Sequence, residues 1–261
     1  MVKLKTKEEI AILREAGKKA AFILNELKKD CVPGASTMDI NKKALQMCKD
    51  AGAEPSFLGY QPWTAPRPFP AALCVSVNDV IIHGIPNEKP IVLKEGDIVS
   101  LDIGLIYKGL FVDTAVSIGV GEIDTKAAKL LEAGQKSLDA AIFVCKPGIR
   151  TGDIGHAVES AMAYYKKTYG FNLADPVLGG HGVGHGVHED PFVPNSSAKN
   201  QGYQLKPGLV IAIEPMVNEG TWRIKADNDG YTYRTGDGKR SVHFEHTVAI
   251  TEDGVEVLTE L

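Results

Sequence analysis

Each half of this 261-residue chain carries similar short segments in the same order, and this internal repeat constrains the fold more than any other feature. The segment Cys31-Val-Pro-Gly-Ala-Ser-Thr-Met-Asp-Ile recurs as Cys145-Lys-Pro-Gly-Ile-Arg-Thr-Gly-Asp-Ile, with six of ten positions identical at an offset of 114. The segment that starts at Leu93 recurs from Leu205 at an offset of 112. This spacing is far longer than the repeats of solenoid proteins. It predicts an ancient duplication, with halves of about 1–122 and 123–261.

The two halves predict the same order of elements. Thr6-Lys-Glu-Glu9 is a capping box, and the apolar residues after it have helical spacing until Pro33-Gly34. Helices are predicted after Thr6, after Ser36, near 125–144 and near 151–169. In each half a short strand and a hairpin follow the helices. We therefore expect an α+β fold in which helices cover one face of a shared antiparallel sheet.

The composition limits the class of protein. Hydrophobic residues make up 44% and charged residues 24%, which is typical of a globular protein, and no apolar run reaches the roughly 18 residues of a membrane span. The net charge of −4 gives no electrostatic case for nucleic acid, and we expect Lys3, Lys5 and Lys7 to form a solvated face. The Lys-rich start lacks the apolar stretch of a signal peptide. Four cysteines without a C-x-x-C pair predict reduced thiols in a cytoplasmic protein.

Four carboxylates interrupt otherwise apolar, β-prone runs. Asp102 and Asp113 lie in one predicted hairpin, Glu214 and Glu245 lie in the other, and the repeat aligns Asp102 with Glu214. If the first hairpin turns at Tyr107, Asp102 directly faces Asp113. Buried carboxylates this close need a shared proton or a cation. Because four of them exceed the charge of one divalent ion, they predict a two-metal centre, which is a known hydrolytic arrangement.

A glycine-laced histidine segment lies between the two acid pairs. His181 and His185 have the i, i+4 spacing of a helical zinc site, but the alternating glycines disfavour a helix by about 1 kcal/mol each. One histidine of this segment is therefore predicted to be a ligand, with the others beside the site or on the surface. Oxygen-rich ligation with one imidazole suits Mn, Fe, Co or Zn. His83 ends an apolar run before a glycine, which alone decides nothing.

These features resemble the methionine aminopeptidases over nearly the whole chain. The family's five metal ligands match, in order and spacing, Asp102, Asp113, His181, Glu214 and Glu245. The segments Gly180-His-Gly-Val-Gly and His188-Glu-Asp-Pro also resemble family motifs. Only 25 residues separate His188 from Glu214, which resembles type I. The resemblance implies the pita-bread fold, a pseudo-twofold antiparallel sheet covered by helices, in a single catalytic domain over 1–261.

The resemblance also implies a reaction and a role for each site residue. A dimetal hydrolase of this family removes the N-terminal methionine from nascent proteins and peptides by means of a metal-bound hydroxide. Asp113 and Glu245 would bridge the metals, Asp102 would hold one metal, and His181 with Glu214 would hold the other. Glu214 would also shuttle a proton, His188 would hydrogen-bond the scissile peptide, and His83 would contact the substrate. The best-matching positions for a methionine pocket are Tyr60, Phe69, Cys74 and Tyr231, with Phe57 as a further candidate.

Some features depart from the family pattern or leave alternatives open. His185 stands where Arg is often found, His243 stands where Gln is common, and the proline-rich stretch 61–70 is unusually long. The alternatives are an aminopeptidase P or prolidase relative, which uses the same ligands, and a non-catalytic binding protein on the same fold. The first usually has an extra N-terminal domain, and the second usually loses ligands. A cytoplasmic monomer is expected, and ribosome association stays open because no charge patch indicates it.

Overall fold

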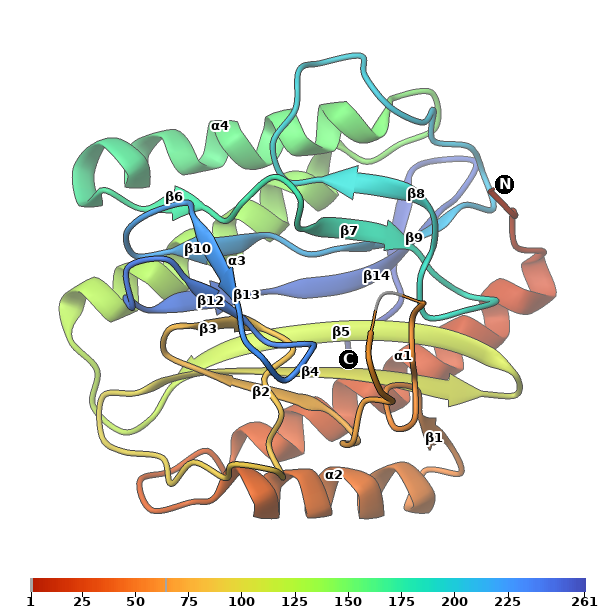
Figure 1. The fold of residues 1–261 in the computed structure, drawn as a ribbon. Helices are drawn as coiled ribbons and strands as arrows, with labels where there is room; N and C mark the ends of the chain where they lie inside the picture. Colours follow the sequence, from red (N-terminus) through yellow and green to blue (C-terminus); the bar gives the residue numbers. More distant parts are fainter. Residues whose placement is uncertain (1, 64) are drawn as a thin grey trace.

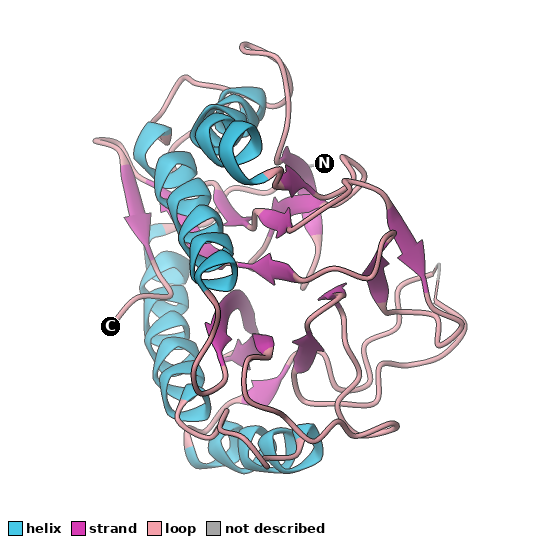
Figure 2. Cartoon of the chain, turned by 90° about the vertical axis from the view of Figure 1, so that its left-hand side faces the viewer, coloured by secondary structure: helices cyan, strands magenta, loops and turns pink. Residues whose placement is uncertain are grey.

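The computed structural model describes residues 2–63 and 65–261, and it confirms the expected α+β architecture (Figures 1 and 2). The helices are α1 (Lys7–Lys28), α2 (Thr37–Asp50), α3 (Thr125–Val144) and α4 (Thr151–Tyr169). The strands are β1 (Glu54–Pro55), β2 (Cys74–Val77), β3 (Val80–Ile82), β4 (Ile98–Tyr107), β5 (Leu110–Gly119), β6 (Asn172–Leu173), β7 (Gly179–Gly182), β8 (Glu189–Pro194), β9 (Val210–Ile213), β10 (Met216–Asn218), β11 (Ile224–Ala226), β12 (Tyr233–Thr235), β13 (Ser241–His243), β14 (Glu245–Ile250) and β15 (Val255–Val257).

The helices α1, α2 and α3 begin where the sequence predicts them, because polar side chains cap their first turns. The Thr6 hydroxyl accepts a hydrogen bond from the Glu9 backbone, and the Glu9 carboxylate accepts one from the Thr6 backbone at 2.7 Å, which completes the capping box. Ser36 caps α2, and Asp124 caps α3 by accepting from a backbone amide at 2.7 Å. Such caps satisfy backbone donors that the helix itself leaves unpaired.

The central antiparallel sheet joins strands from both halves of the chain. Its order is β1-β4-β5-β14-β9-β7-β8, with β2 added to β4 and β15 added to β14. Strand β5 of the first half pairs with β14 of the second half, where Ala115 lies opposite Glu245. Outward from this junction, β4 carries Asp102 and β9 is followed at once by Glu214. The four acids therefore come from four neighbouring strands whose order is symmetric about the β5–β14 junction.

The register of the β4–β5 hairpin differs from the predicted one. Asp102 lies opposite Ala115 and not opposite Asp113. The turn consists of Lys108 and Gly109, which both have positive φ, at 49° and 79°. A two-residue turn of this kind matches the twist of the flanking strands, which is why it replaces the earlier turn we expected. Side chains alternate along a strand with a period of two, so the two aspartates still share a face as diagonal neighbours.

Two hydrophobic clusters form the core, and each belongs mainly to one half. The first gathers side chains of α1, α2, β2, β4 and β5, including Leu13 and Leu101, and the second gathers those of α3, α4, β9 and β14, including Leu130 and Ile211. Figure 2 shows the helices along one side of the sheet, with most long loops on the other side. Each helix thus buries its apolar stripe against the sheet, as its spacing predicts.

The predictions from composition hold in part. No helix among the described residues combines the length and apolarity that crossing a membrane requires. The four cysteines are buried free thiols, as predicted. The predicted solvated lysine face is wrong for Lys5, because Lys3 and Lys7 are exposed but the Lys5 side chain is only 1% exposed. Lys5 pairs with Glu189, a residue far away in the sequence that periodicity cannot place beside it.

Candidate active site

A cavity of about 150 Å³ collects every residue that the sequence analysis assigned to a site. Its lining draws on both halves of the chain and includes Phe57, Tyr60, Phe69, Cys74, His83, Asp102, Asp113, His181, His188, Glu214, Tyr231 and Glu245. The cavity is smaller than the roughly 300–1,000 Å³ of sites for drug-sized ligands. It has room for about one side chain, with acidic and histidine residues at one part of its wall and aromatic residues at another.

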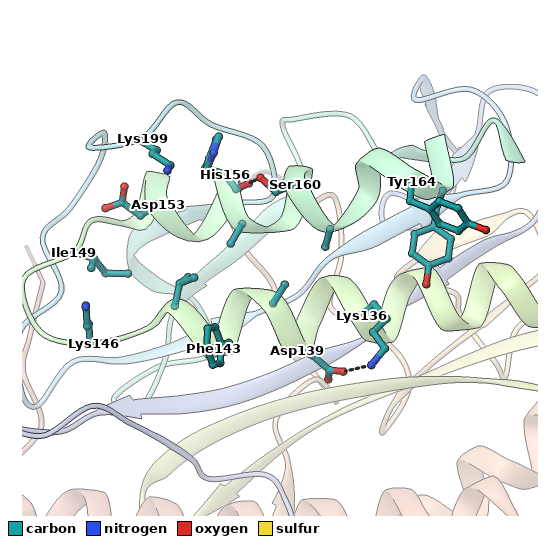
Figure 3. A pocket seen from close by; sticks show the side chains of 15 residues that line it. Lys136, Asp139, Phe143, Lys146, Ile149, Asp153, His156, Ser160, Tyr164 and Lys199 are labelled. Carbon is teal, nitrogen blue, oxygen red and sulfur yellow. Dashed lines mark hydrogen bonds and ion pairs between the residues drawn. The ribbon is translucent and has the colours of Figure 1, made fainter. Parts of the chain in front are cut away.

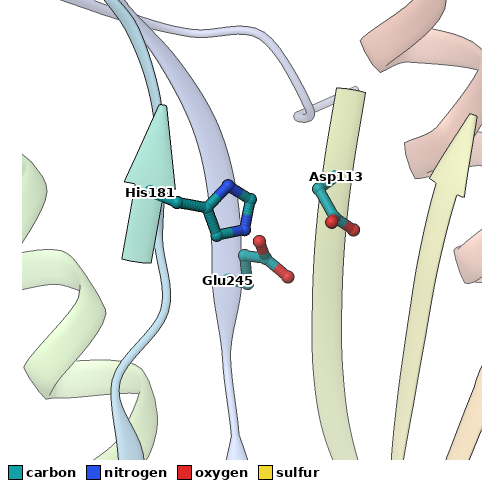
Figure 4. Close-up of side chains that lie close together, drawn as sticks. All are labelled: Asp113, His181 and Glu245. Atoms are coloured by element: carbon teal, nitrogen blue, oxygen red, sulfur yellow. The ribbon is translucent and has the colours of Figure 1, made fainter. Parts of the chain in front are cut away.

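The acids and His181 form a buried cluster. Asp102, Asp113, Glu214 and Glu245 are each less than a tenth exposed. Ligand atoms of Asp113, His181 and Glu245 lie within 4.8 Å of one another, and Figure 4 shows the three side chains directed toward a common space from three different strands. The His181 Nε2 atom lies 3.4 Å from Glu214 Oε1, which brings a third acid to the same cluster.

Burial and mutual repulsion shift the pKa values of these acids. Burial raises the pKa of Asp102 to about 6, and burial together with the Asp102 charge raises the pKa of Asp113 well above its usual value. Burial and the Asp113 charge do the same to the pKa of Glu245. Burial also acts to raise the pKa of Glu214, but contact with His243 and the nearby His181 outweigh it and hold that pKa below its usual value. Without a cation, the cluster therefore retains protons near neutral pH.

The donor set fits a divalent metal ion. Among the described residues, Asp102 Oδ1, Asp113 Oδ1 and His243 Nε2 are buried without a hydrogen-bond partner. Buried polar atoms are nearly always paired, so the two aspartate oxygens have lone pairs available to a ligand that the protein does not itself supply. Carboxylate oxygens with a single imidazole suit a divalent transition metal, as the sequence predicts. The unpaired His243 nitrogen lies 3.4 Å from Glu214 Oε2, too poorly placed to be fully satisfied.

Two further histidines lie beside this cluster. The His188 ring is centred 4.4 Å from the His181 ring, and its Nδ1 atom shares a 2.9 Å hydrogen bond with the Tyr60 hydroxyl. Burial, with His181 and His83 nearby, lowers the pKa of His188 to about 3. Burial also lowers the pKa of His83, which has a positive φ of 58°. Both imidazoles are therefore neutral at neutral pH, and Nε2 of His188 remains available to a bound molecule.

Aromatic rings form the apolar part of the cavity. Phe69 packs edge-on against Phe57, with ring centroids 6.4 Å apart, and against Tyr231 at 5.1 Å. The Tyr231 hydroxyl donates to the Tyr60 carbonyl at 3.1 Å, which fixes its ring. Burial raises the pKa of Cys74 well above its usual value, so this thiol is neutral. The wall is thus apolar and rigid, which suits an uncharged side chain.

Sequence reasoning missed some of the lining. Tyr233 also faces the cavity, with its ring 6.2 Å from that of His83. Its position two residues after Tyr231, itself a predicted pocket residue, is the one sequence signal that pointed to it. His243, singled out earlier only as a departure from the family pattern, lines the cavity as well. Pro62 and Ala65, which belong to the proline-rich stretch 61–70, also line the cavity.

His185 lies outside the cavity. Its Nε2 atom is 2.7 Å from the Glu9 Oε1 atom, and its side chain is part-exposed. Glu9 is also the acid of the α1 capping box. The unusual histidine at position 185 therefore contributes to a contact between the histidine segment and α1, and not to the cavity.

A larger, open groove lies between α3 and α4, with a volume of about 1,280 Å³ (Figure 3). Its lining includes the exposed rings of Phe143 and Tyr164, and Lys136 forms an ion pair with Asp139 at 3.7 Å. None of the site residues predicted from the sequence lines this groove. The smaller cavity is therefore the candidate active site.

Comparison with known proteins gives the same picture as the geometry. The family model described as metallopeptidase family M24 matches residues 11–252. Methionine aminopeptidase 1 of Bacillus subtilis (strain 168) is 43% identical over 261 residues, covering 100% of each chain. The crystal structure of methionine aminopeptidase from Thermotoga maritima superposes with a TM-score of 0.91 at 42% identity, covering 100% of each chain.

A second group of solved structures shares the fold at lower similarity. The prolidase from Pyrococcus furiosus superposes with a TM-score of 0.75 at 25% identity, covering 99% of this chain but 65% of that one. The architecture is therefore the pita-bread fold shared by these peptidases, as expected. A buried cluster of acids and histidine on this fold, and a family match that spans nearly the whole sequence, lead to one conclusion: the chain belongs to metallopeptidase family M24.

Proposed function

We propose that this protein is a type I methionine aminopeptidase, a metal-dependent hydrolase that removes the N-terminal methionine from nascent proteins and peptides. The observation that carries the proposal is that one small cavity contains both a candidate metal site and an apolar pocket. A buried cluster of acids and histidine adjoins an aromatic wall with room for about one apolar side chain. Full-length similarity to proteins named methionine aminopeptidase supports the same activity.

The aromatic wall would hold the methionine side chain of the substrate. The side chains of Tyr60, Phe69, Cys74 and Tyr231, together with Phe57, offer apolar surface and no charged group. A thioether makes favourable contacts with aromatic rings. The same closed wall would exclude water from the side chain and orient the first peptide bond toward the acid cluster. Burial of the methionine would thus supply binding energy for positioning.

The polar residues would hold the reacting peptide and move its protons. We assign to Glu214 the proton transfer from the attacking water to the leaving amine, because the two histidines beside it keep its carboxylate ionised. His188 Nε2 would donate to the scissile carbonyl oxygen, since its Nδ1 atom is occupied by Tyr60. His83 would contact the amide on the leaving side. These roles are proposals from geometry and family resemblance.

Two divalent ions, of Mn, Fe, Co or Zn, complete the proposal. Asp102, Asp113, His181, Glu214 and Glu245 would hold them. When bound, such ions lower the pKa of a water molecule and polarise the scissile carbonyl. Two ions also match the charge of four carboxylates, and the raised pKa values of Asp102, Asp113 and Glu245 indicate how poorly the protein alone stabilises their charges.

We further propose that residues 1–261 form one catalytic domain made of two pseudo-repeats, about 1–122 and 123–261. The symmetric strand order about the β5–β14 junction supports this division. Four buried, unpaired thiols support a reducing, cytoplasmic location, and we take the protein to be a monomer. Light scattering tests the monomer, and co-sedimentation with ribosomes tests whether the enzyme meets its nascent chains there.

A peptide panel tests the proposed activity. The purified protein should release methionine from Met-Gly or Met-Ala peptides and bind about two divalent ions, the number that a two-metal hydrolase requires. A chelator and the Asp102→Ala substitution should each abolish release. Asp50→Ala, which removes an exposed carboxylate outside the cavity, should leave release unchanged.

The same panel separates the alternative activities. Cleavage of Xaa-Pro peptides without cleavage of Met-Ala would favour the prolidase relative, whose fold this chain shares over 99% of its length. Absence of both cleavage and metal binding would leave only the non-catalytic binding protein on this fold.

A further inference from the structure

Lys5 is a buried lysine that the proposed reaction does not use. Its side chain is 1% exposed, and its Nζ atom lies 2.6 Å from Glu189 Oε2 and donates to the Lys3 carbonyl at 3.2 Å. The Lys5 backbone amide donates to the Gly208 carbonyl at 2.7 Å, so the residue is held at both ends. Lysines are almost never fully buried without a partner. Neither Lys5 nor Glu189 lines the cavity.

The Glu189 carboxylate connects Lys5 to the glycine-rich histidine segment. While one oxygen contacts Lys5, the other accepts hydrogen bonds from the backbone amides of His185 and Gly186, the latter at 2.8 Å. This turn contains two glycines and has little conformational preference of its own. The Lys5 stem also packs on Gly184, where a Cβ atom would lie 2.3 Å from Lys5 Cε. The Lys5–Glu189 ion pair therefore holds the turn formed by residues 184–188 in place.

The turn held in this way leads directly into His188. Glu189 is the next residue and begins β8. Successive side chains of an extended chain point to opposite sides, so Glu189 faces the buried lysine while His188 faces the cavity. The His188 ring lines the cavity, and the 2.9 Å hydrogen bond to the Tyr60 hydroxyl holds only one of its two ring nitrogens. Its position depends on the backbone that Glu189 anchors.

We propose that the Lys5–Glu189 ion pair is a clamp that positions His188 for the reaction. The catalytic part of this inference rests on the proposed function, whereas the structural part does not. The pair acts through the backbone of residues 185–189 and touches neither substrate nor metal. Lys5 and Glu189 are thus positioning residues, and the first segment of the chain forms part of the active-site support.

Substitutions that remove the charge but keep the shape test the clamp. Lys5→Met keeps the apolar stem, and Glu189→Gln keeps an oxygen for the two amides. Each should lower kcat on a Met-Ala peptide by about 10–100-fold with a much smaller change in KM, because a misplaced group loses reactivity more than affinity. Lys108→Met, which breaks an exposed pair with Glu15, should leave both constants unchanged.

Combination with His188→Ala separates positioning from a general effect on folding. If Lys5 acts through His188, adding Lys5→Met to His188→Ala should change kcat by less than about twofold, since residues that act as a unit are not additive. A full 10–100-fold loss in that background would overturn the clamp. So would wild-type kinetics in both Lys5→Met and Glu189→Gln.

Amide hydrogen exchange tests the clamp without any activity. In Lys5→Met the amides of His185 and Gly186 should exchange faster, while the amides of α4 should keep their protection. Unchanged exchange at both positions would overturn the proposal. If the wild-type enzyme releases no methionine, the proposed function fails, and the exchange measurement alone decides whether the clamp exists.

Discussion

At the scale of a single residue, Asp113 shows how unfavourable a buried negative charge is in this site. It is buried, it neighbours Asp102 and Glu245, and one of its oxygens has no partner among the described residues. Its pKa is raised by burial first and by its acidic neighbours second. A buried carboxylate in this position costs stability in the metal-free protein and becomes favourable only when a cation shares it. Its contribution to stability should therefore depend on metal.

Asp113→Asn tests this dependence. The metal-free variant should be as stable as the metal-free wild type or more so, because it removes one buried carboxylate that its acidic neighbours repel. Addition of metal at 100 times its Kd should stabilise the wild type by about 2.7 kcal/mol and the variant by much less. Thermal unfolding with and without metal measures both effects. Equal metal stabilisation in the two proteins would exclude Asp113 as a ligand.

At the scale of elements, close packing outweighs intrinsic propensity in α1. Gly17 lies inside this helix, where glycine is about 1 kcal/mol less favourable than alanine. A Cβ atom at this position would lie 2.0 Å from the Leu258 carbonyl oxygen, which is backbone and cannot turn away. The glycine therefore lets the helix lie directly against the C-terminal segment.

Gly17→Ala should destabilise the protein although it improves helix propensity. Overpacking typically costs about 1–3 kcal/mol, and the shift of α1 needed to relieve it would disturb the first core cluster. Urea unfolding measures the loss. Lys18→Ala, on the exposed side of the same helix, should change stability by less than about 0.5 kcal/mol. A more stable Gly17→Ala variant would show that the C-terminal segment yields to the helix.

The junction between the two halves links stability to the site at the scale of the whole molecule. The Thr247 hydroxyl accepts from the Asp113 backbone amide at 2.9 Å and donates to the Asp113 carbonyl at 2.7 Å. On the same junction, the Thr114 hydroxyl donates to the Glu245 carbonyl at 2.9 Å. Side chains of each half thus hold the backbone of the acid in the other half. The cluster can form only when both halves are docked.

Thr247→Val should weaken folding and metal binding together. It leaves two buried backbone groups of Asp113 without partners, at a cost of about 1–3 kcal/mol. Metal affinity should fall by about 10–100-fold, as is usual when the residues that orient a ligand are removed. Unfolding and calorimetric titration check the two effects, with exposed Thr168→Val as the control. Loss of stability at unchanged metal affinity would uncouple the junction from the site.

Local signals in the sequence were sufficient for much of the fold. The caps at Thr6, Ser36 and Asp124 and the helical spacing after them depend on neighbours within one or two turns, so the helices begin where they were predicted. The acids were identifiable because a carboxylate inside an apolar strand is anomalous whatever its partners. The alternation of strands placed them on one face even though the turn, and hence the register, was misjudged.

What the sequence alone determined was the set of elements and the chemical type of the site, which is an α+β chain with buried acids whose charge favours a divalent cation. What only the tertiary structure decided was which residues far apart in the chain meet. It showed that His188 faces the cavity while His185 contacts Glu9, and that Lys5 is buried against Glu189. The physical reason is that propensity and periodicity act over a few residues, whereas burial and charge pairing depend on contacts across the whole fold.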